Sequence, residues 1–374
     1  MVERISTSGA GSDEAELVEA VRDSVRAFAK ARPMQQDEAG RKAEWQEVAD
    51  AGWLGLLADA AVGGSELSLE IMAALHEELG RAGVVEPYCA VSVLALAAID
   101  QCEPGKERDA LLGELTSGAA CPVLCWQDEP NRDDRDLPFV VIGQSGGSDV
   151  SAGRVLIDFA DRATHFCIPA DRQGRAGLLV IGRDDPGLAV SLVPSLSGSS
   201  LGRLEFNGRV ADAAFLPLPD RSALAPAFIL ARIAAAAQLS GLCARITAMT
   251  VEFASQRVQF GKAIATNQVV QHRLVDMWSQ HTLAASAVGN AARACSSGVT
   301  SGELAALAAK ARAGTAADAV TKGAFQLHGA IGYTGEYPLG ALARGCLSLT
   351  NWLGAPGALG RRFVELERSG EQSA

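Results

Sequence analysis

The residues best suited to acid–base, nucleophilic or metal chemistry are scattered through this chain. Cys121 and Cys125 form the closest cysteine pair, in the order C-P-V-L-C, and no histidine–cysteine cluster completes a zinc site. Four histidines belong to no recognisable catalytic or metal-ligating pairing with an acid or cysteine, namely His76, His165, His272 and His281. We therefore expect no metal site, and we expect the eight cysteines to be reduced core residues.

A cation, an amide and an aromatic ring lie close together at Arg257, Gln259 and Phe260. A guanidinium group can make two charge-assisted hydrogen bonds to a phosphate. An arginine and a phenylalanine at this spacing could equally cap and pack a helical bundle. The spacing alone leaves both interpretations open.

The composition is that of a folded soluble protein. The 374 residues are 48% hydrophobic and 21% charged, enough for two or three domains with a large core. The net charge of −11 argues against a nucleic-acid or anionic-membrane surface. Residues 1–12 lack the apolar stretch of a secretory signal, and Arg232 interrupts the longest apolar run. We expect no membrane span and a cytoplasmic location.

Residues 1–117 are predicted to form an N-terminal helical domain. Apolar residues recur at helical spacing behind a Ser12–Asp13 cap, at Leu17, Val21, Val25 and Phe28. A further helix is expected from Ser68 to Gly80, where the glycine can end it.

Residues 118–222 are predicted to form a small antiparallel β domain. Clusters of Gly, Asp, Pro and Ser separate short β-favouring runs, and residues 128–138 form a polar, charged loop. The runs are Phe139–Ile142, Arg154–Phe159, Phe166–Ile168, Leu178–Ile181, Leu188–Val193 and Leu204–Phe206.

Residues 223–374 are predicted to form a C-terminal helical bundle. Long stretches rich in alanine and leucine occupy residues 225–257, 268–296 and 302–328. The expected fold class is therefore mainly α with a central β domain.

Four segments, in this order, resemble those of the acyl-CoA dehydrogenase family. GWLGLLADAAVGGSELS (52–68) and EELGRA (77–82) are similar to its N-terminal segments, and RVQFGKAIATNQVVQHRLVDM (257–277) to a helix pair. QLHGAIGYTGEYPL (326–339) is similar to a C-terminal loop. The resemblance implies an N-terminal helical domain, a small β domain and a C-terminal four-helix bundle. It also implies FAD-dependent α,β-dehydrogenation of an acyl-CoA thioester.

In that family each flavin lies at a dimer interface, and two chains build its site. The resemblance assigns Arg257 and Gln259 to the pyrophosphate and Phe260 to the adenine of the partner's flavin. Further amide and backbone donors would come from Gln268, Gln326, Gly329 and Ala330. Ala330 stands where the family has a second glycine.

The half of the site that the family builds from its β domain is altered here. CWQDEPNRDDRD (125–136) stands where the family has T-E-P-x-A-G-S-D. Leu156 and Asp158 replace the aromatic and hydroxyl groups that would contact the flavin ring, and an aspartate would repel a reduced flavin anion. We do not expect this β domain to bind a flavin ring.

The family's reaction needs a carboxylate within hydrogen-bonding reach of the α-proton. The resemblance places its two known positions at Leu353 and Ala231, which are both apolar. Glu336 belongs to a structural turn of the family, and Glu252 is expected on a solvent-exposed helix face. We therefore predict no catalytic residue in this chain.

The sequence thus predicts a degenerate, non-catalytic subunit like those of actinobacterial heteromeric acyl-CoA dehydrogenases of steroid side-chain degradation. Its partner would supply the flavin-ring half-site and the catalytic glutamate, in an α2β2 heterotetramer that shares FAD across a subunit interface. Two alternatives stay open. One is a homo-oligomeric acyl-CoA dehydrogenase with a relocated base, and the other is a non-enzymatic acyl-CoA-binding protein.

Overall fold

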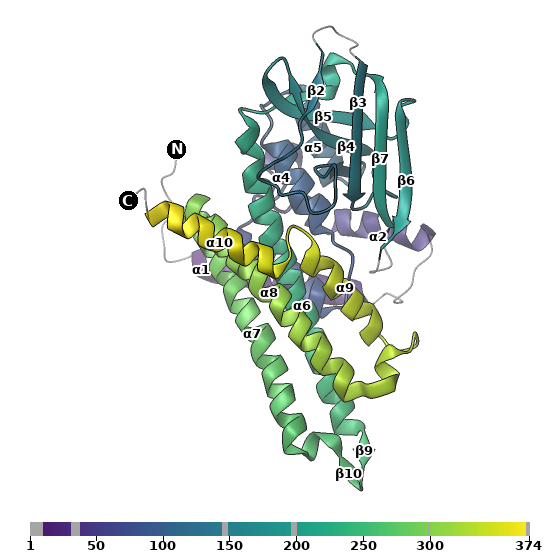
Figure 1. The fold of residues 1–374 in the computed structure, drawn as a ribbon, viewed down its shortest axis with the longest axis vertical. Helices are drawn as coiled ribbons and strands as arrows, with labels where there is room; N and C mark the ends of the chain where they lie inside the picture. The colour runs from purple at the N-terminus through teal and green to yellow at the C-terminus, as the bar shows by residue number, and fades with distance from the viewer. Residues whose placement is uncertain (1–9, 31–37, 144–148, 196–199, 298, 372–374) are drawn as a thin grey trace. The chain divides into compact units, whose positions relative to one another are not determined.

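The computed structural model describes residues 10–30, 38–143, 149–195, 200–297 and 299–371. The chain divides into two compact units, whose elements are labelled in Figure 1. Unit 1 contains Met1–Gln36, Leu67–Val85 and Ile233–Cys346, and unit 2 contains Asp37–Glu66, Glu86–Arg232 and Leu347–Ala374. The three-domain division at residues 117 and 222 stays a prediction.

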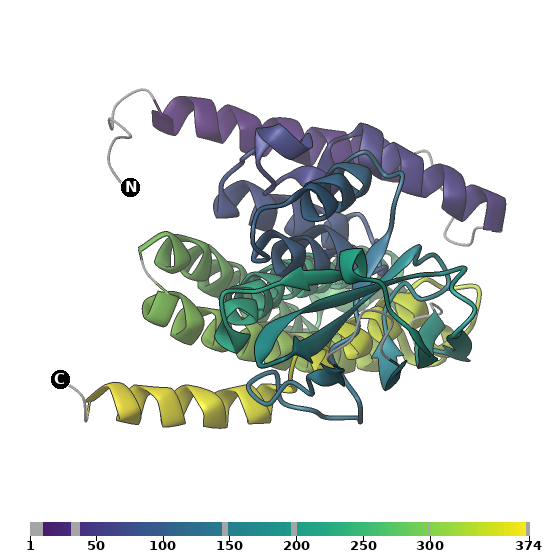
Figure 2. The same ribbon diagram turned by 90° about the horizontal axis from the view of Figure 1, so that it is seen from above.

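Unit 1 is built from long helices. Helix α1 (Ala10–Lys30) packs on α3 (Leu69–Arg81). Helix α7 (Gln268–Ser297) runs beside α8 (Val299–His328), as Figures 1 and 2 both show. Helix α6 (Ala225–Gln256) belongs to unit 1 from Ile233 onwards. The three long helices lie close to where the alanine- and leucine-rich stretches predicted them, because these residues favour helix strongly.

Two details of unit 1 differ from the prediction. Helix α1 begins at Ala10, so Ser12 and Asp13 lie in its first turn rather than before it. Gly80 does not end α3, which continues to Arg81. A Cβ at Gly80 would lie 2.2 Å from the Gln238 carbonyl oxygen, and one at Gly241 would lie 1.9 Å from that of Glu77. The two glycines therefore allow α3 and α6 to cross at close range.

Unit 2 contains two β-sheets. The first has the order β1-β4-β5-β8, with β2 also paired to β4, and the second has the order β3-β7-β6. The strands of the first sheet are β1 (Pro122–Leu124), β2 (Val140–Ile142), β4 (His165–Arg172), β5 (Arg175–Gly182) and β8 (Phe215–Pro217). Those of the second are β3 (Asp149–Ile157), β6 (Leu188–Pro194) and β7 (Ser200–Arg209).

The prediction of an antiparallel β domain is only partly correct. The second sheet is antiparallel throughout, but β1 and β2 both pair with β4 in parallel. Strand β4 is almost continuously buried, whereas β3 and β7 show the alternating burial of half-exposed strands. The three-residue strands β1 and β8 were not predicted, whereas β2, of the same length, lies within the predicted run Phe139–Ile142.

Helices surround the sheets of unit 2. They are α2 (Glu38–Asp50), a π-helix η3 (Ala90–Ala95), α4 (Leu96–Asp100), α5 (Lys106–Thr116), the start of α6 and α10 (Pro356–Glu371). Helix α9 (Leu339–Asn351) begins in unit 1 and ends in unit 2. Neither α9 nor α10 was among the stretches that the alanine- and leucine-rich composition picked out.

Helix α6 contains the longest apolar helical stretch in the described part of the chain. With the turn before it, Arg221–Gln256 has an 18-residue window of mean hydropathy 1.6, long and apolar enough to cross a membrane. Within the structure 94% of that window is buried, as in the core helix of a soluble protein. All eight cysteines are free thiols, and only Cys295 is not fully buried.

Candidate functional site

A two-residue hairpin turn follows α6 in unit 1 and carries three of the predicted binding residues. Strands β9 (Val258–Gln259) and β10 (Lys262–Ala263) pair in antiparallel register across Phe260 and Gly261. Both turn residues have positive φ angles, 52° and 80°, which defines a type I′ turn. The ring of Phe260 is fully exposed, and Arg257 and Gln259 are exposed beside it.

The other predicted binding residues are also exposed in unit 1. Gln268 begins α7, Gln326 lies in the last turn of α8, and Gly329 and Ala330 follow α8. Gly329 has a φ of 65°, a conformation that favours glycine, and no atom lies within 4 Å of the position that a Cβ would take. Its backbone is therefore open to approach from outside the chain.

A buried histidine joins the end of α8 to the end of α6. His328 is 6% exposed, and its ring stacks on Phe253 with 4.4 Å between centroids. Its Nδ1 lies 2.9 Å from the Ala324 carbonyl oxygen, so Nδ1 carries the proton and Nε2 accepts a hydrogen bond from the Tyr337 hydroxyl at 2.9 Å. Burial lowers the pKa of His328. This histidine therefore positions the two exposed segments and does not act as a surface base.

The two acids that remained as candidate bases lie on the surface of unit 1. Glu252 is exposed on α6 and accepts a hydrogen bond from Gln256 at 3.2 Å, one helical turn away. Glu336 is exposed in the turn before α9. Glu252 thus lies on a solvated helix face, as the sequence predicted.

Both positions that would carry the family's carboxylate are buried and apolar in unit 2. Leu353 is 4% exposed, and Ala231, on α6, is fully buried. Leu353 has a φ of 56°, which costs a leucine about 1–3 kcal/mol. Its carbonyl oxygen accepts a hydrogen bond from Arg232 Nε at 3.2 Å. Neither side chain can accept a proton.

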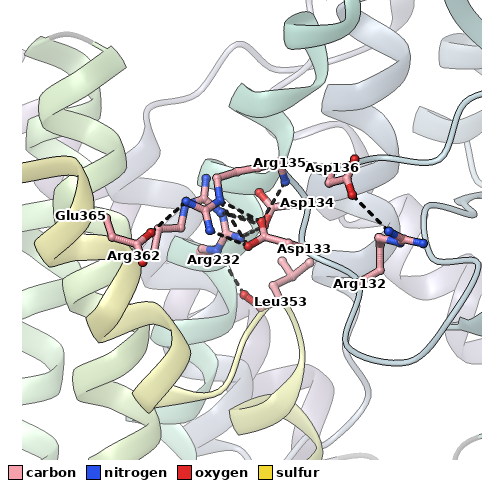
Figure 3. A network of polar contacts seen from close by, with 9 residues as sticks. All are labelled: Arg132, Asp133, Asp134, Arg135, Asp136, Arg232, Leu353, Arg362 and Glu365. Carbon is pink, nitrogen blue, oxygen red and sulfur yellow. Dashed lines mark hydrogen bonds and ion pairs between the residues drawn. The ribbon is translucent and has the colours of Figure 1, made fainter. Parts of the chain in front are cut away.

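The charged loop after β1, residues 128–136, lies beside Arg232 (Figure 3). Asp134 accepts a hydrogen bond from Arg232 Nη2, and another from Arg362 Nη1 on α10 at 2.8 Å. The side chains of Arg232, Asp134 and Arg362 are only 2%, 9% and 8% exposed. The sequence had predicted a polar loop here and did not predict that its carboxylate is buried.

A second set of contacts ties the same loop to its surroundings. Arg135 pairs with Asp133 at 2.8 Å and with Glu365 of α10 at 3.2 Å. The hydrogen bond from Arg135 is the main reason why the pKa of Asp133 falls to about 2. Arg154 of β3 is 3% exposed and donates to the carbonyl oxygens of Cys125 and Pro138, at 3.0 and 2.6 Å. Arg154 thereby holds both ends of the loop together.

This loop borders a cavity of about 530 Å³ that is lined only by unit 2 residues. Leucines from β3, β7, α10 and the α9–α10 loop line it together with Trp126 and Trp352. Asp158 also lines the cavity, and the Trp352 indole N–H donates a hydrogen bond to it. Burial raises the pKa of Asp158 to about 7, although the bond from Trp352 acts in the opposite direction.

Comparison with known proteins fits this architecture. Residues 12–119 match the N-terminal domain of acyl-CoA dehydrogenases, and residues 222–360 match their C-terminal domain. The chain belongs to the acyl-CoA dehydrogenase family. Members of this family are FAD-dependent oxidoreductases that act on CH–CH groups.

Several relatives come from mycobacteria or from complexes of two different chains. The acyl-CoA dehydrogenase FadE27 of Mycobacterium tuberculosis is 26% identical over 272 residues, which is 72% of each chain. A variant of the steroid acyl-CoA dehydrogenase Tcur3481–Tcur3483 is 25% identical with a TM-score of 0.81, covering 97% and 99% of the two chains. The ChsE4–ChsE5 complex of M. tuberculosis shares the fold at 22% identity, with a TM-score of 0.79 and coverage of 97% and 98%.

The residues of unit 1 suit the family's cofactor better than those of unit 2 do. In unit 1, the exposed Arg257 and Phe260 suit the phosphates and adenine of an FAD bound by a neighbouring chain. In unit 2, Asp158 and the carboxylate-rich loop do not suit a flavin ring that becomes anionic when reduced.

Proposed function

We propose that this chain is the non-catalytic subunit of a heteromeric, FAD-dependent acyl-CoA dehydrogenase. The observation that carries the proposal is an asymmetry between the two units. The residues that would contact a partner's FAD are exposed and intact, whereas Leu353 and Ala231 fill the positions of the base with buried apolar side chains.

In the proposed complex the chain contributes binding and no proton transfer. Arg257 and Gln259 bind the pyrophosphate of the partner's FAD, and Phe260 stacks on its adenine. Gln268, Gln326, Gly329 and Ala330 supply further donors. When bound, FAD accepts the hydride from the substrate, and the partner supplies the carboxylate that removes the α-proton.

An exposed apolar helix face supports assembly with another chain. Four large apolar side chains of α7 are more than half exposed, and they lie within about half of the helix circumference. They are Val269, Val275, Trp278 and Leu283, at 70%, 59%, 57% and 55%. A patch of this kind is typical of a subunit interface.

The relatives suggest the substrate class and the composition of the complex. Both structural relatives described above are named for two different chains, and one is named a steroid acyl-CoA dehydrogenase. We therefore infer that the substrate is the CoA thioester of a steroid side chain and that the complex is an α2β2 heterotetramer. We also propose a cytoplasmic location, as the sequence predicted.

The flavin content of the complex tests the proposal. The chain is expressed alone and together with an acyl-CoA dehydrogenase-like chain that keeps the catalytic glutamate, and flavin absorbance is compared with protein concentration. We expect a colourless or insoluble chain alone and one FAD per pair of chains in the complex. A ratio of one FAD per chain, or a yellow protein that acyl-CoA bleaches in the absence of a partner, would favour the homo-oligomeric alternative.

A further inference from the structure

The unit 2 cavity is large enough for a ligand and has an apolar wall. Its volume is about 530 Å³, within the range of small-molecule sites. Leu156 is 40% exposed and Leu347 is 49% exposed, whereas Leu353 and Leu359 are buried. A ligand that entered would therefore meet leucine side chains at every depth.

The charged groups at the cavity disfavour an anionic ligand. Asp134 forms ion pairs with both Arg232 and Arg362, Asp133 lies 3.8 Å from Arg362 Nη1, and Arg132 pairs with carboxylates of its own loop at 2.8–3.2 Å. Nη1 of Arg232 has no hydrogen-bond partner among the described residues, but this atom is itself buried. The ion pairs of the loop involve six carboxylates and four guanidinium groups, and Arg154, which bonds backbone carbonyls at both ends of the loop, is a fifth guanidinium beside it. The paired groups are Asp128, Glu129, Asp133, Asp134, Asp136 and Glu365, against Arg132, Arg135, Arg232 and Arg362.

Asp158 differs from the other acids that line the cavity, because no cation in the described part of the chain forms an ion pair with it. A bulge at the end of β3 presents it, where the pairing with β7 shifts between Arg154 and Ile157. Leu156 and Phe159 flank it with φ angles of 55° and 56°. Two strained residues in four indicate a backbone that the surrounding structure holds in place.

Core packing fixes the far side of this strained segment. The ring of Phe159 lies 6.2 Å from that of Trp45 and 5.7 Å from that of Tyr88, and Ile157 is 2% exposed. Asp158 therefore occupies a set position at the cavity. Since burial raises its pKa to about 7, its carboxyl group can donate as well as accept a hydrogen bond near neutral pH.

We propose that this cavity is a binding site of the chain itself for an uncharged, largely apolar molecule with a carbonyl or hydroxyl oxygen, which Asp158 binds. The site belongs to unit 2 and uses none of the FAD-sharing residues of unit 1. It takes a class of ligand that differs in charge from the flavin anion and from the CoA phosphates.

Three probes that share a naphthalene ring and differ in their polar group test the proposal. 2-Acetonaphthone can only accept a hydrogen bond, 2-naphthol can donate or accept, and 2-naphthoate is an anion. Binding is measured by calorimetry on the full-length chain in the assembly in which it is purified. We expect both neutral probes to bind at pH 6, with 2-naphthoate at least tenfold weaker. Binding of 2-naphthoate as tight as that of the ketone, or no binding of either neutral probe, would overturn the proposal.

The pH dependence of ketone binding identifies the group responsible. The ketone needs the protonated carboxyl, so its affinity should fall at least tenfold between pH 6 and pH 9, as Asp158 ionises. The other charged groups of the cavity, Arg132, Asp133, Asp134, Arg232 and Arg362, are already engaged in ion pairs. Asp158→Asn keeps a donor that does not titrate, so its affinity should be independent of pH. The exposed Asp184→Asn should behave as the unaltered chain does.

Two further variants in this chain locate the site. Asp158→Leu removes the donor, and Ala358→Trp fills the cavity from α10 without touching Asp158. Each should weaken ketone binding at least tenfold, and both test the same cavity if one variant folds poorly. Unchanged ketone binding in a folded sample of either variant, or the same pH dependence in Asp158→Asn, would show that the probe binds elsewhere and would overturn the assignment.

Discussion

Leu353 combines burial, a left-handed backbone and the position at which the resemblance predicts the family's carboxylate. The side chain is 4% exposed, and its carbonyl oxygen is bonded to Arg232. A φ of 56° is unfavourable for a leucine, so the surrounding loop must impose this angle. The residue therefore contributes to packing rather than to chemistry.

Substitution at position 353 separates these two roles. Leu353→Ala should cost about 2–5 kcal/mol of unfolding free energy, because a buried leucine is truncated, but kcat of the assembled complex should change only a few-fold. Leu353→Glu should not add a second active site, because the proposed complex binds no flavin ring beside it and a buried, unpaired acid takes up a proton or destabilises the fold. Both are measured as turnover per complex, and a doubled kcat for Leu353→Glu would contradict the proposal.

His76 on α3 should make the stability of the chain depend on pH. It is 1% exposed, its ring nitrogens have no hydrogen-bond partner among the described residues, and burial lowers its pKa to about 4. The unfolded chain, with an ordinary histidine pKa near 6.5, binds the proton more readily, so this contribution is complete above about pH 6.5 and falls as the pH drops towards 4. The loss should reach about 3 kcal/mol. Urea unfolding at pH 7 and pH 4.5 should show a smaller difference for His76→Leu, whereas exposed His272→Gln should match the unaltered chain.

At the scale of the element, the turn of the β9–β10 hairpin contains a residue that lowers the stability of the chain. A phenylalanine at a positive φ angle, with its ring fully exposed, packs against nothing in the described chain and strains the backbone. Such a residue is expected where the side chain is needed for binding. The turn of the hairpin is therefore better suited to binding a ligand or partner than to stabilising the fold.

Phe260→Asn should stabilise the chain and weaken FAD binding at the same time. Asn-Gly is the preferred pair for a type I′ turn, so we expect a gain of up to about 1 kcal/mol in urea unfolding. Loss of the Phe260 ring should release FAD from the complex, although the proposal places the flavin ring on the other subunit. Arg257→Ala should weaken FAD binding more than tenfold without the gain in stability. Unchanged FAD affinity in both variants would show that the hairpin is structural only.

The charged loop after β1 should be essential to the stability of unit 2. Asp134→Ala leaves Arg232 and Arg362 without their shared buried carboxylate, which should cost about 3–5 kcal/mol. Asp136→Asn is a matched control on the same loop, because its side chain is 84% exposed and its ion pair should contribute no more than about 1 kcal/mol. Equal, small effects of the two substitutions in urea unfolding would show that the loop is not held by this network.

The sequence predicted these elements better than their contacts. The residues that form α6, α7 and α8 were sufficient to predict all three helices, because helix propensity is a local property of the sequence. The burial of Asp134 depends on Arg232 and Arg362, which are 98 and 228 residues away. One signal was available: an arginine at position 232 within an apolar helix requires a counter-charge, and the loop at 128–136 is rich in acids. The sequence contains no comparable signal for the left-handed backbone angles of Leu353, Leu156 and Phe159.

At the scale of the whole molecule, the exposed face of α7 indicates that the chain works in an assembly. Val269, Val275, Trp278 and Leu283 would remain hydrated in an isolated chain. Since burying such side chains stabilises association, α7 should belong to the interface of the proposed heteromer. The proposed FAD-binding residues of the hairpin would then need that interface to function.

Trp278→Glu should weaken the complex without unfolding the chain. Its side chain is 57% exposed, so the substitution should change unfolding free energy little, while a charge within an apolar interface should impair assembly. Size-exclusion chromatography with light scattering should show smaller species that have lost FAD. Val141→Glu on β2, which is 75% exposed, serves as the control and should assemble normally. Normal assembly of Trp278→Glu would exclude this face from the interface.

The buried contact between Asp134 and Arg232 also bears on how this chain could evolve. A single reversion to glutamate at position 353 would introduce an acid beside a guanidinium that already has its carboxylate and already bonds the backbone of that position. Regaining an active site would therefore require the charged loop and the cavity to change together with the reversion, and removal of Asp134 first would destabilise unit 2. In the proposed non-catalytic subunit, a carboxylate at position 353 would thus be difficult to restore by single substitutions, and selection could preserve the proposed two-chain arrangement.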